Sequence, residues 1–157
     1  EYGSIKISQS YSLLDEDSEE PFSDIYTRIK WIPVHQAKII YKTYFNVYGE
    51  GFISHNFEGN YQNSRGDKFG LEYVFTESTD TEQVNVELEA ALLANWFIEM
   101  EVEHSISEEE TNEAEIALIY RAPCWSVAVQ SEYTPTDTRF MVIFNLANLG
   151  SPFRLNY

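Results

Sequence analysis

Five glutamates recur at every second position in two neighbouring stretches of the chain. They are Glu87, Glu89, Glu99, Glu101 and Glu103. Alternate residues of a β-strand point to the same side, so this spacing would gather the five carboxylates on one face. Such a group could bind calcium, or two of its members could act as a general acid and base. The favoured interpretation is a hydrated acidic wall with neither role.

Histidine and cysteine offer little further chemistry. His35, His55 and His104 lie far apart without the short spacings of a metal site, so no metal ion or other cofactor is expected. Cys124 is the only cysteine, so it has no disulfide partner within the sequence. Taken alone, it is expected to be an isolated thiol that acts as a small apolar residue. There is no glycine loop typical of nucleotide binding, and no enzymatic activity is expected.

Alternation of apolar and polar residues predicts that β-strands carry these side chains. The two kinds of residue alternate strictly over residues 84–90 and again over 98–103. The same period of two recurs along the chain, which predicts a single all-β domain over residues 1–157. The ten expected strands span residues 3–13, 23–32, 37–48, 52–62, 68–76, 83–92, 96–105, 113–121, 124–133 and 138–147.

A helix is the competing interpretation for residues 86–104, which are rich in Glu, Leu and Ala. On that helix, Glu99 would intrude on an apolar face that includes Leu88 and Trp96. Strict alternation on both sides of Asn95 favours a hairpin instead.

The expected strands are long. Strands in soluble proteins average about 5–6 residues, whereas a tilted strand needs about ten to cross a bilayer. The connectors after the second, fourth, sixth and eighth strands are short. Those after the first, fifth, seventh and ninth are longer and more polar, and residues 49–51 form a short exception. Short turns on one rim and longer loops on the other are typical of an up-and-down outer-membrane β-barrel.

Aromatic residues gather near the expected strand ends. The set predicted for the short-turn rim is Trp31, Tyr61, Phe69, Trp96, Tyr120 and Trp125. The set predicted for the other rim is Tyr11, Tyr26, Phe75, Tyr133 and Phe140. Indole and phenol rings favour the boundary between membrane and water, although aromatic residues are also common in strands generally.

The membrane interpretation gives each face of the strands a role. Lipid would contact Val84, Val86, Leu88, Ile98, Met100, Val102, Ile116 and Leu118. The five glutamates would line a water-filled lumen, because burying an unpaired carboxylate in a packed core costs roughly several kcal/mol. In a soluble sheet, the same acidic face would be the solvent-exposed one.

Overall charge limits the partners. The chain has 26 acidic and 10 basic residues, a formal net charge of −16. This charge disfavours nucleic acid and anionic membrane surfaces as partners. No apolar run reaches about 18 residues, so no transmembrane helix is expected.

The C-terminal part of the sequence resembles a known family. It contains CWSV at residues 124–127, an expected strand, a Pro-Thr-Asp loop, and RFMVIFNLANLG at residues 139–150. This order is similar to the C-terminal end of the LPS-assembly family LptD, also called OstA. YGSIKISQSY at residues 2–11 and PFSDIY at 21–26 resemble upstream barrel strands of that family. The resemblance covers nearly the whole chain, and the order and spacing of its motifs carry it.

The resemblance implies a large barrel in the outer membrane of a Gram-negative bacterium. This barrel inserts lipopolysaccharide into the outer leaflet through a lateral gate between its first and last strands. The implied partners are lipopolysaccharide, outer-membrane lipid, a plug lipoprotein, and a periplasmic LPS bridge protein that contacts an N-terminal domain. This chain would be the C-terminal segment of the transmembrane barrel. The strand at 138–147 would be its last strand and one edge of the gate, with Phe140, Val142, Phe144 and Leu146 along it.

The resemblance also implies a role for Cys124. Members of the family place cysteine near the C-terminus and join it by disulfides to cysteines of the N-terminal region, so the partner of Cys124 would lie outside this chain. Counting strands back from the expected last one puts residues 122–124 on the periplasmic rim, in an oxidising compartment. Two alternatives to the family assignment stay open. One is a complete ten-stranded outer-membrane barrel that acts as a pore or an enzyme. The other is a soluble antiparallel β-barrel that binds an apolar ligand.

Overall fold

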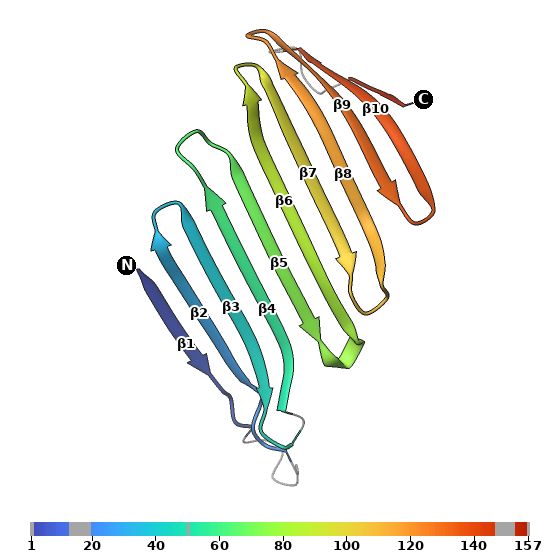
Figure 1. Ribbon diagram of the computed structural model, residues 1–157. Coiled ribbons are helices and arrows are strands. Elements are labelled where there is room, and N and C mark those ends of the chain that lie inside the picture. Colours follow the sequence, from blue (N-terminus) through green and yellow to red (C-terminus); the bar gives the residue numbers. More distant parts are fainter. Residues whose placement is uncertain (1, 13–19, 50, 147–152, 157) are drawn as a thin grey trace.

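A single antiparallel sheet makes up the described part of the protein. The structure is a computed structural model that describes residues 2–12, 20–49, 51–146 and 153–156. The sheet has eleven strands in sequence order, and all neighbours are antiparallel (Figure 1). The strands are β1 (Gly3–Ser8), β2 (Ile25–Val34), β3 (Ala37–Asn46), β4 (Gly51–Gln62), β5 (Lys68–Thr76), β6 (Thr81–Leu93), β7 (Trp96–Ser105), β8 (Glu110–Arg121), β9 (Trp125–Thr134), β10 (Asp137–Leu146) and β11 (Phe153–Asn156). A 3₁₀ turn, η1 (Glu77–Thr79), joins β5 to β6.

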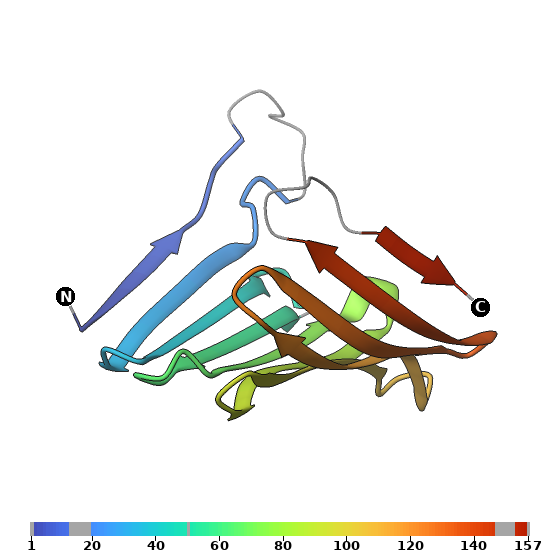
Figure 2. The same cartoon turned by 90° about the horizontal axis from the view of Figure 1, so that it is seen from above.

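The sheet is curved but open. β1 and β11 form its two edges and do not pair with each other. Figure 2 shows the sheet as a trough whose long edges stand apart. The expected all-β, up-and-down antiparallel architecture is confirmed as an open curved sheet, not as a closed barrel.

The ten expected strands correspond to β1–β10, with a shorter first strand. β1 ends at Ser8, whereas the expected strand ran to residue 13. Beyond Ser8, residues 9 and 10 make hydrogen bonds to Ser23 outside the strand pairing. Gln9 Nε2 donates a hydrogen bond to the Ser23 carbonyl (3.0 Å), and the Ser10 amide donates one to Ser23 Oγ (2.8 Å). Residues 13 and 147, at the ends of the expected first and tenth strands, and 14–19 of the expected first connector lie outside the described residues.

The last strand differs from the expectation. β10 is not the final strand of the sheet, because Met141–Phe144 also pair with β11 on the far side from β9. β11 has only four residues, too few for a period of two to stand out in the sequence. The gate role inferred for Phe140, Val142, Phe144 and Leu146 stays a prediction.

The hairpin prediction for residues 86–104 is confirmed. β6 and β7 pair up to Leu93 and Trp96 around a two-residue turn, so the helical interpretation of residues 86–104 is wrong. No helix in the described part of the chain is both long and apolar enough to cross a bilayer. The predicted contrast in connector length is largely wrong. Thr134 pairs with Asp137, so the β9–β10 connection is a tight turn. The β5–β6 and β7–β8 connections are also shorter than the β4–β5 connection, which was predicted to be one of the short ones.

The sheet has only a thin core. Its buried hydrophobic residues within the described ranges are Ile40, Ala117, Ile119, Ala128 and Met141. No second layer of described residues covers either face (Figure 2). Because soluble domains normally bury one sheet face against another layer, a single uncovered sheet requires another partner for its apolar side.

Candidate functional site

Strand register separates the side chains into two faces. Leu88 lies opposite Met100, and Met100 lies opposite Ile116. One position along each strand, Glu87 lies opposite Glu101, which in turn lies opposite Glu115. Directly opposed residues of an antiparallel pair point to the same side. The side with Leu88 is called the apolar face below, and the side with Glu87 the polar face.

The polar face is the concave one. All five buried hydrophobic residues lie on it by register, including Ile40 opposite Glu58 and Ala117 opposite Glu99. Curvature crowds side chains together on the inner side of a sheet and spreads them apart on the outer side. The apolar face is therefore convex.

The apolar face is uncovered across the sheet. Ile5 on β1 is 70% exposed, and Ile116 in the middle of β8 is 47% exposed. Other exposed large residues on this face are Ile7, Ile29, Trp31, Tyr61, Phe69, Leu118, Val129, Phe140, Val142 and Phe144. An apolar surface with exposed large residues from β1 to β10 marks a contact with protein or lipid, because soluble monomers rarely expose more than a few hundred Å² of contiguous apolar area.

The aromatic residues predicted for the short-turn rim form two groups. In the first, the Trp96 and Tyr120 ring centroids are 5.2 Å apart, and those of Tyr120 and Trp125 are 5.3 Å apart. Phe144 of β10 extends this row, 5.9 Å from Trp125. In the second group, Tyr61 and Phe69 are directly opposed on β4 and β5, and Trp31 lies near the turn that joins β2 to β3. All six predicted residues lie on the apolar face.

A separate aromatic cluster surrounds His55, nearer to the rim opposite the short turns. Its Nδ1 lies 2.7 Å from the Tyr41 hydroxyl and 3.3 Å from Thr43 Oγ1. The rings of Phe52 and Phe75 lie 5.2 Å and 5.8 Å from the imidazole. The sequence interpretation gave His55 no specific role, because its neighbours come from three strands and only the register brings them together.

The polar face carries the predicted glutamates, some with partners. Glu89 pairs with Lys68 (2.8 Å) and Glu99 with Arg121 (2.8 Å). Glu103 accepts a hydrogen bond from Asn112 Nδ2 (3.0 Å). Glu87 and Glu101 make no ion pair with any residue that the structure describes. Their row continues to Glu115 and Glu132, so four carboxylates face each other across four strands. Directly opposed like charges are destabilising, and water is what can screen them.

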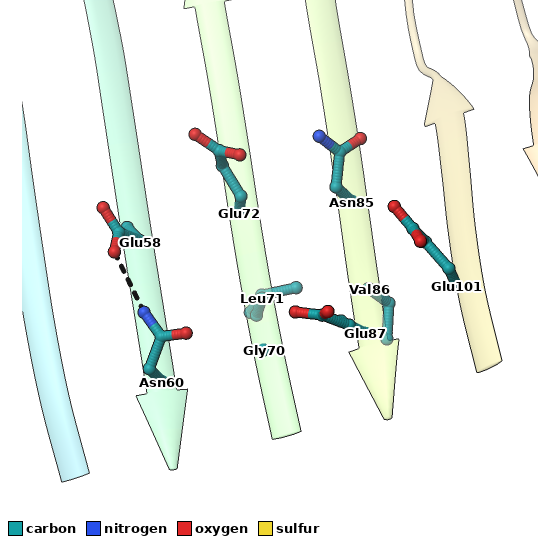
Figure 3. Close-up of a pocket in the computed structure, with 9 residues that line it drawn as sticks. All are labelled: Glu58, Asn60, Gly70, Leu71, Glu72, Asn85, Val86, Glu87 and Glu101. Carbon is teal, nitrogen blue, oxygen red and sulfur yellow. Dashed lines mark hydrogen bonds between the residues drawn. The ribbon is translucent and has the colours of Figure 1, made fainter. Parts of the chain in front are cut away.

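A hollow on this face brings several of the acids together. Figure 3 shows its polar side chains, from β4 to β7. It measures about 260 Å³ and is lined by Glu58, Asn60, Gly70, Leu71, Glu72, Asn85, Val86, Glu87 and Glu101. Gly70 leaves room for Glu87, because a Cβ at Gly70 would lie 3.2 Å from Glu87 Oε2 and 3.3 Å from its Cβ.

The turn between β4 and β5 is held by Asp67. Its Oδ1 accepts a hydrogen bond from the Ala91 amide (2.8 Å), and its Oδ2 accepts from Asn63 Nδ2 (2.6 Å). Arg65 also donates to Oδ2 from its guanidinium. The bond from Ala91, then those from Arg65 and Asn63, lower the pKa of Asp67 to about 2. This side chain thereby fastens the turn to β6, where the ladder with β7 has a register shift near Ala91.

Cys124 lies in the turn between β8 and β9, directly before Trp125. Its thiol is exposed and free. The turn is closed by the Ala122 amide, which donates to the Trp125 carbonyl (2.8 Å). An external thiol could therefore reach Cys124, and the implied disulfide stays a prediction. The strand count that put residues 122–124 on the periplasmic rim no longer holds, because β11 follows β10 in the sheet.

The described residues contain no group of three or more His, Cys, Asp or Glu side chains that could hold a metal ion. No model of a known protein family matches the chain, and no curated protein sequence is similar to it.

Proposed function

We propose that this chain is the C-terminal segment of a transmembrane β-barrel of the LPS-assembly family LptD (OstA) in a Gram-negative outer membrane. The observation that carries the barrel proposal is the exposed apolar face on the convex side of an uncovered sheet. In a bilayer, this face contacts lipid tails and the polar face contacts water. β2–β10 have 9–13 residues each, which suits tilted strands that cross a membrane.

The sequence motifs at residues 124–127 and 139–150 support the lipopolysaccharide part of the proposal. The polar concave face suits it as well, because a hydrated wall lets a hydrophilic saccharide move without adhering to apolar residues. The protein then acts without catalysis. Its partners are lipopolysaccharide, outer-membrane lipid, a plug lipoprotein and a periplasmic LPS bridge protein.

The open edges fit this proposal better than a complete ten-stranded barrel. β1 and β11 each leave one side of their backbone unpaired, which is costly in lipid, and further strands of a larger barrel would pair with them. A soluble barrel that binds an apolar ligand would present its large apolar residues to the concave side, whereas here most of the exposed large apolar residues lie on the convex side.

Refolding the chain into phospholipid vesicles tests the membrane part. Trp31, Trp96 and Trp125 all belong to one rim, so lipids brominated near the headgroup should quench their fluorescence more than lipids brominated near the chain ends. Emission that no brominated lipid quenches would contradict the barrel proposal. Depletion of the full-length protein tests the transport part, with lipopolysaccharide at the cell surface as the readout. Unchanged surface lipopolysaccharide would contradict that part alone.

A further inference from the structure

Charge is segregated along the polar face. The acids described above occupy β4–β9, whereas β1–β3 present basic side chains. These are Lys6, Arg28, Lys30, Lys38 and Lys42, half of the 10 basic residues in the chain. Sequence reasoning did not find this group, because its members come from three separate stretches and only the register places them on one side.

Three of these cations form a row across adjacent strands. Lys6 lies opposite Arg28, and Arg28 lies opposite Lys42. Lys42 approaches Glu58 at 3.9 Å, a distance at the limit of an ion pair. Lys6, Arg28 and Lys30 make no ion pair within the described ranges. Opposed like charges repel, so a bound anion would stabilise this part of the sheet.

A hollow of about 300 Å³ adjoins the cation row. Ser8, Tyr26 and Tyr44 lie opposite one another across the same three strands and are called the tyrosine row below. This row is two residues closer than the cation row to the rim where β1 connects to β2, which is called the long-loop rim below. The hollow is lined by Ser8, Gln9, Ser10, Ser23, Asp24, Tyr26 and Tyr44. The rings of Tyr26 and Tyr44 lie 5.0 Å apart. Tyr26 was expected in an aromatic belt facing lipid, but the register puts it on the face of Arg28.

The polar groups of the hollow are only partly used. Asp24 Oδ1 accepts a hydrogen bond from Asn46 Nδ2 (3.1 Å), which fixes that carboxylate at the edge of the hollow. Ser23 Oγ accepts from the Ser10 amide. The hydroxyls of Tyr26 and Tyr44 make no hydrogen bond to other described residues, so they are available to a ligand.

This combination matches one class of ligand. Sugar rings present C–H faces that pack on aromatic rings, and their hydroxyls bond to phenol, serine and carboxylate oxygens. Phosphate groups bind to arginine and lysine through charge-assisted hydrogen bonds. The cation row lies about 6.6 Å from the tyrosine row, because two strand residues span that distance. A phosphate attached to a sugar ring in the hollow can therefore reach Arg28.

We propose that Tyr26, Tyr44 and the row Lys6–Arg28–Lys42 bind a phosphorylated saccharide on the polar face beside the long-loop rim. The binding site stands on its own geometry. Its assignment to a lipopolysaccharide headgroup rests on the proposed function. In that setting, the site would retain the headgroup at one end of the barrel wall.

The test is calorimetric titration of the whole chain in detergent micelles. The probes are a diphosphorylated glucosamine disaccharide without acyl chains, the same disaccharide without phosphates, and inorganic phosphate. The diphosphorylated disaccharide should bind at least about tenfold more tightly than either other probe, because only it uses both rows. Equal binding of the two disaccharides would overturn the role of the cations. Equal binding of inorganic phosphate would overturn the saccharide part.

Variants assign the contacts. Arg28→Gln should weaken binding of the diphosphorylated probe by about tenfold or more, and Tyr44→Leu should weaken binding of both disaccharides. Lys68→Gln is the matched control, since Lys68 is a polar-face cation bound to Glu89 and distant from the hollow in the strand order, and it should leave affinity unchanged. Far-ultraviolet circular dichroism checks that each variant keeps its sheet. Unchanged affinity in folded Arg28→Gln protein would overturn the proposal.

Two further comparisons separate this inference from the proposed function. Displacement of the probe by a micellar phosphorylated glycolipid would identify a lipid headgroup as the ligand, whereas failure to displace it would assign the site to soluble sugar phosphates. Because the soluble probes need no bilayer, binding without vesicle insertion would reject the barrel and keep the site. Insertion without binding would reject the site and keep the barrel.

Discussion

Replacing Ile116 by arginine tests whether the apolar face contacts lipid. Ile116 lies in the middle of β8, opposite Met100 on β7 and Ser131 on β9. Its side chain is 47% exposed, so no described part of the protein has to move to accept a longer residue. The effect of Ile116→Arg therefore depends mainly on the medium around the sheet.

The two media predict different losses of stability. On the lipid face of a barrel, arginine near the bilayer midplane lowers the free energy of unfolding by about 2–4 kcal/mol, roughly a thirtyfold to thousandfold change in the equilibrium. On a surface exposed to water, the change would stay within about 0.5 kcal/mol. Gln130→Arg is the matched control. Gln130 precedes Ser131 at the same depth but on the polar face, where carboxylates such as Glu132 favour a cation, so a change near zero is expected in either medium.

Guanidinium unfolding of the chain from phospholipid vesicles, followed by tryptophan fluorescence, measures these differences. We expect Ile116→Arg to shift the midpoint strongly and Gln130→Arg to leave it nearly unchanged. If both variants are as stable as the parent in vesicles, the assignment of the apolar face to lipid is refuted. Equal destabilisation would show that both faces are dry and would refute the hydrated polar face.

Three other changes test local features. Asp67→Asn should speed hydrogen exchange of the Ala91 amide at pH 7. The pKa of Asp67 is about 2 in the folded protein and 3.8 ordinarily, so the protection that Asp67 gives the Ala91 amide should be complete above about pH 4 and disappear as pH falls through 2. Equal exchange of this amide in variant and parent at pH 7 would contradict the role of Asp67. Glu101→Gln should raise the free energy of unfolding by about 0.2–1 kcal/mol in thermal melts, because it relieves the repulsion between opposed carboxylates. Glu99→Gln should not, because it breaks the ion pair with Arg121. The reverse order would contradict the unpaired state of Glu101. Cys124 should react rapidly with a polar maleimide in the isolated chain and should not react in the oxidised full-length protein, with mass spectrometry as the readout. Reaction in both proteins would contradict the external disulfide.

Local periodicity was sufficient to predict most of the fold. The side-chain period of a strand is fixed at two, so alternation around Val86 and Met100 determined both the strands and the residues that share a face. Asn95 marked the β6–β7 turn because alternation resumes immediately after it. The period of two also explains why the aromatic residues predicted for the short-turn rim all lie on the apolar face.

Other features depend on register and curvature, which the sequence does not encode locally. Tyr26 fits an aromatic belt by its position near a strand end, but a shift of one residue reverses the face, and pairing with Tyr44 puts it on the polar side. The cluster around His55 requires three strands to be aligned, and the ladder between β3 and β4 contains a register shift near Tyr44. β11 is too short to show a period at all.

The two faces together restrict where this sheet can be stable. The row from Glu87 to Glu132 has four opposed carboxylates, and removing water from it would strengthen their repulsion. The opposite face exposes Ile116 and similar residues across the sheet, and leaving it in water forfeits the main favourable contribution to folding. A partner that surrounds the whole sheet would satisfy only one of these requirements. A boundary between lipid and water, as in the proposed function, would satisfy both, because it would cover the convex side and leave the concave side hydrated.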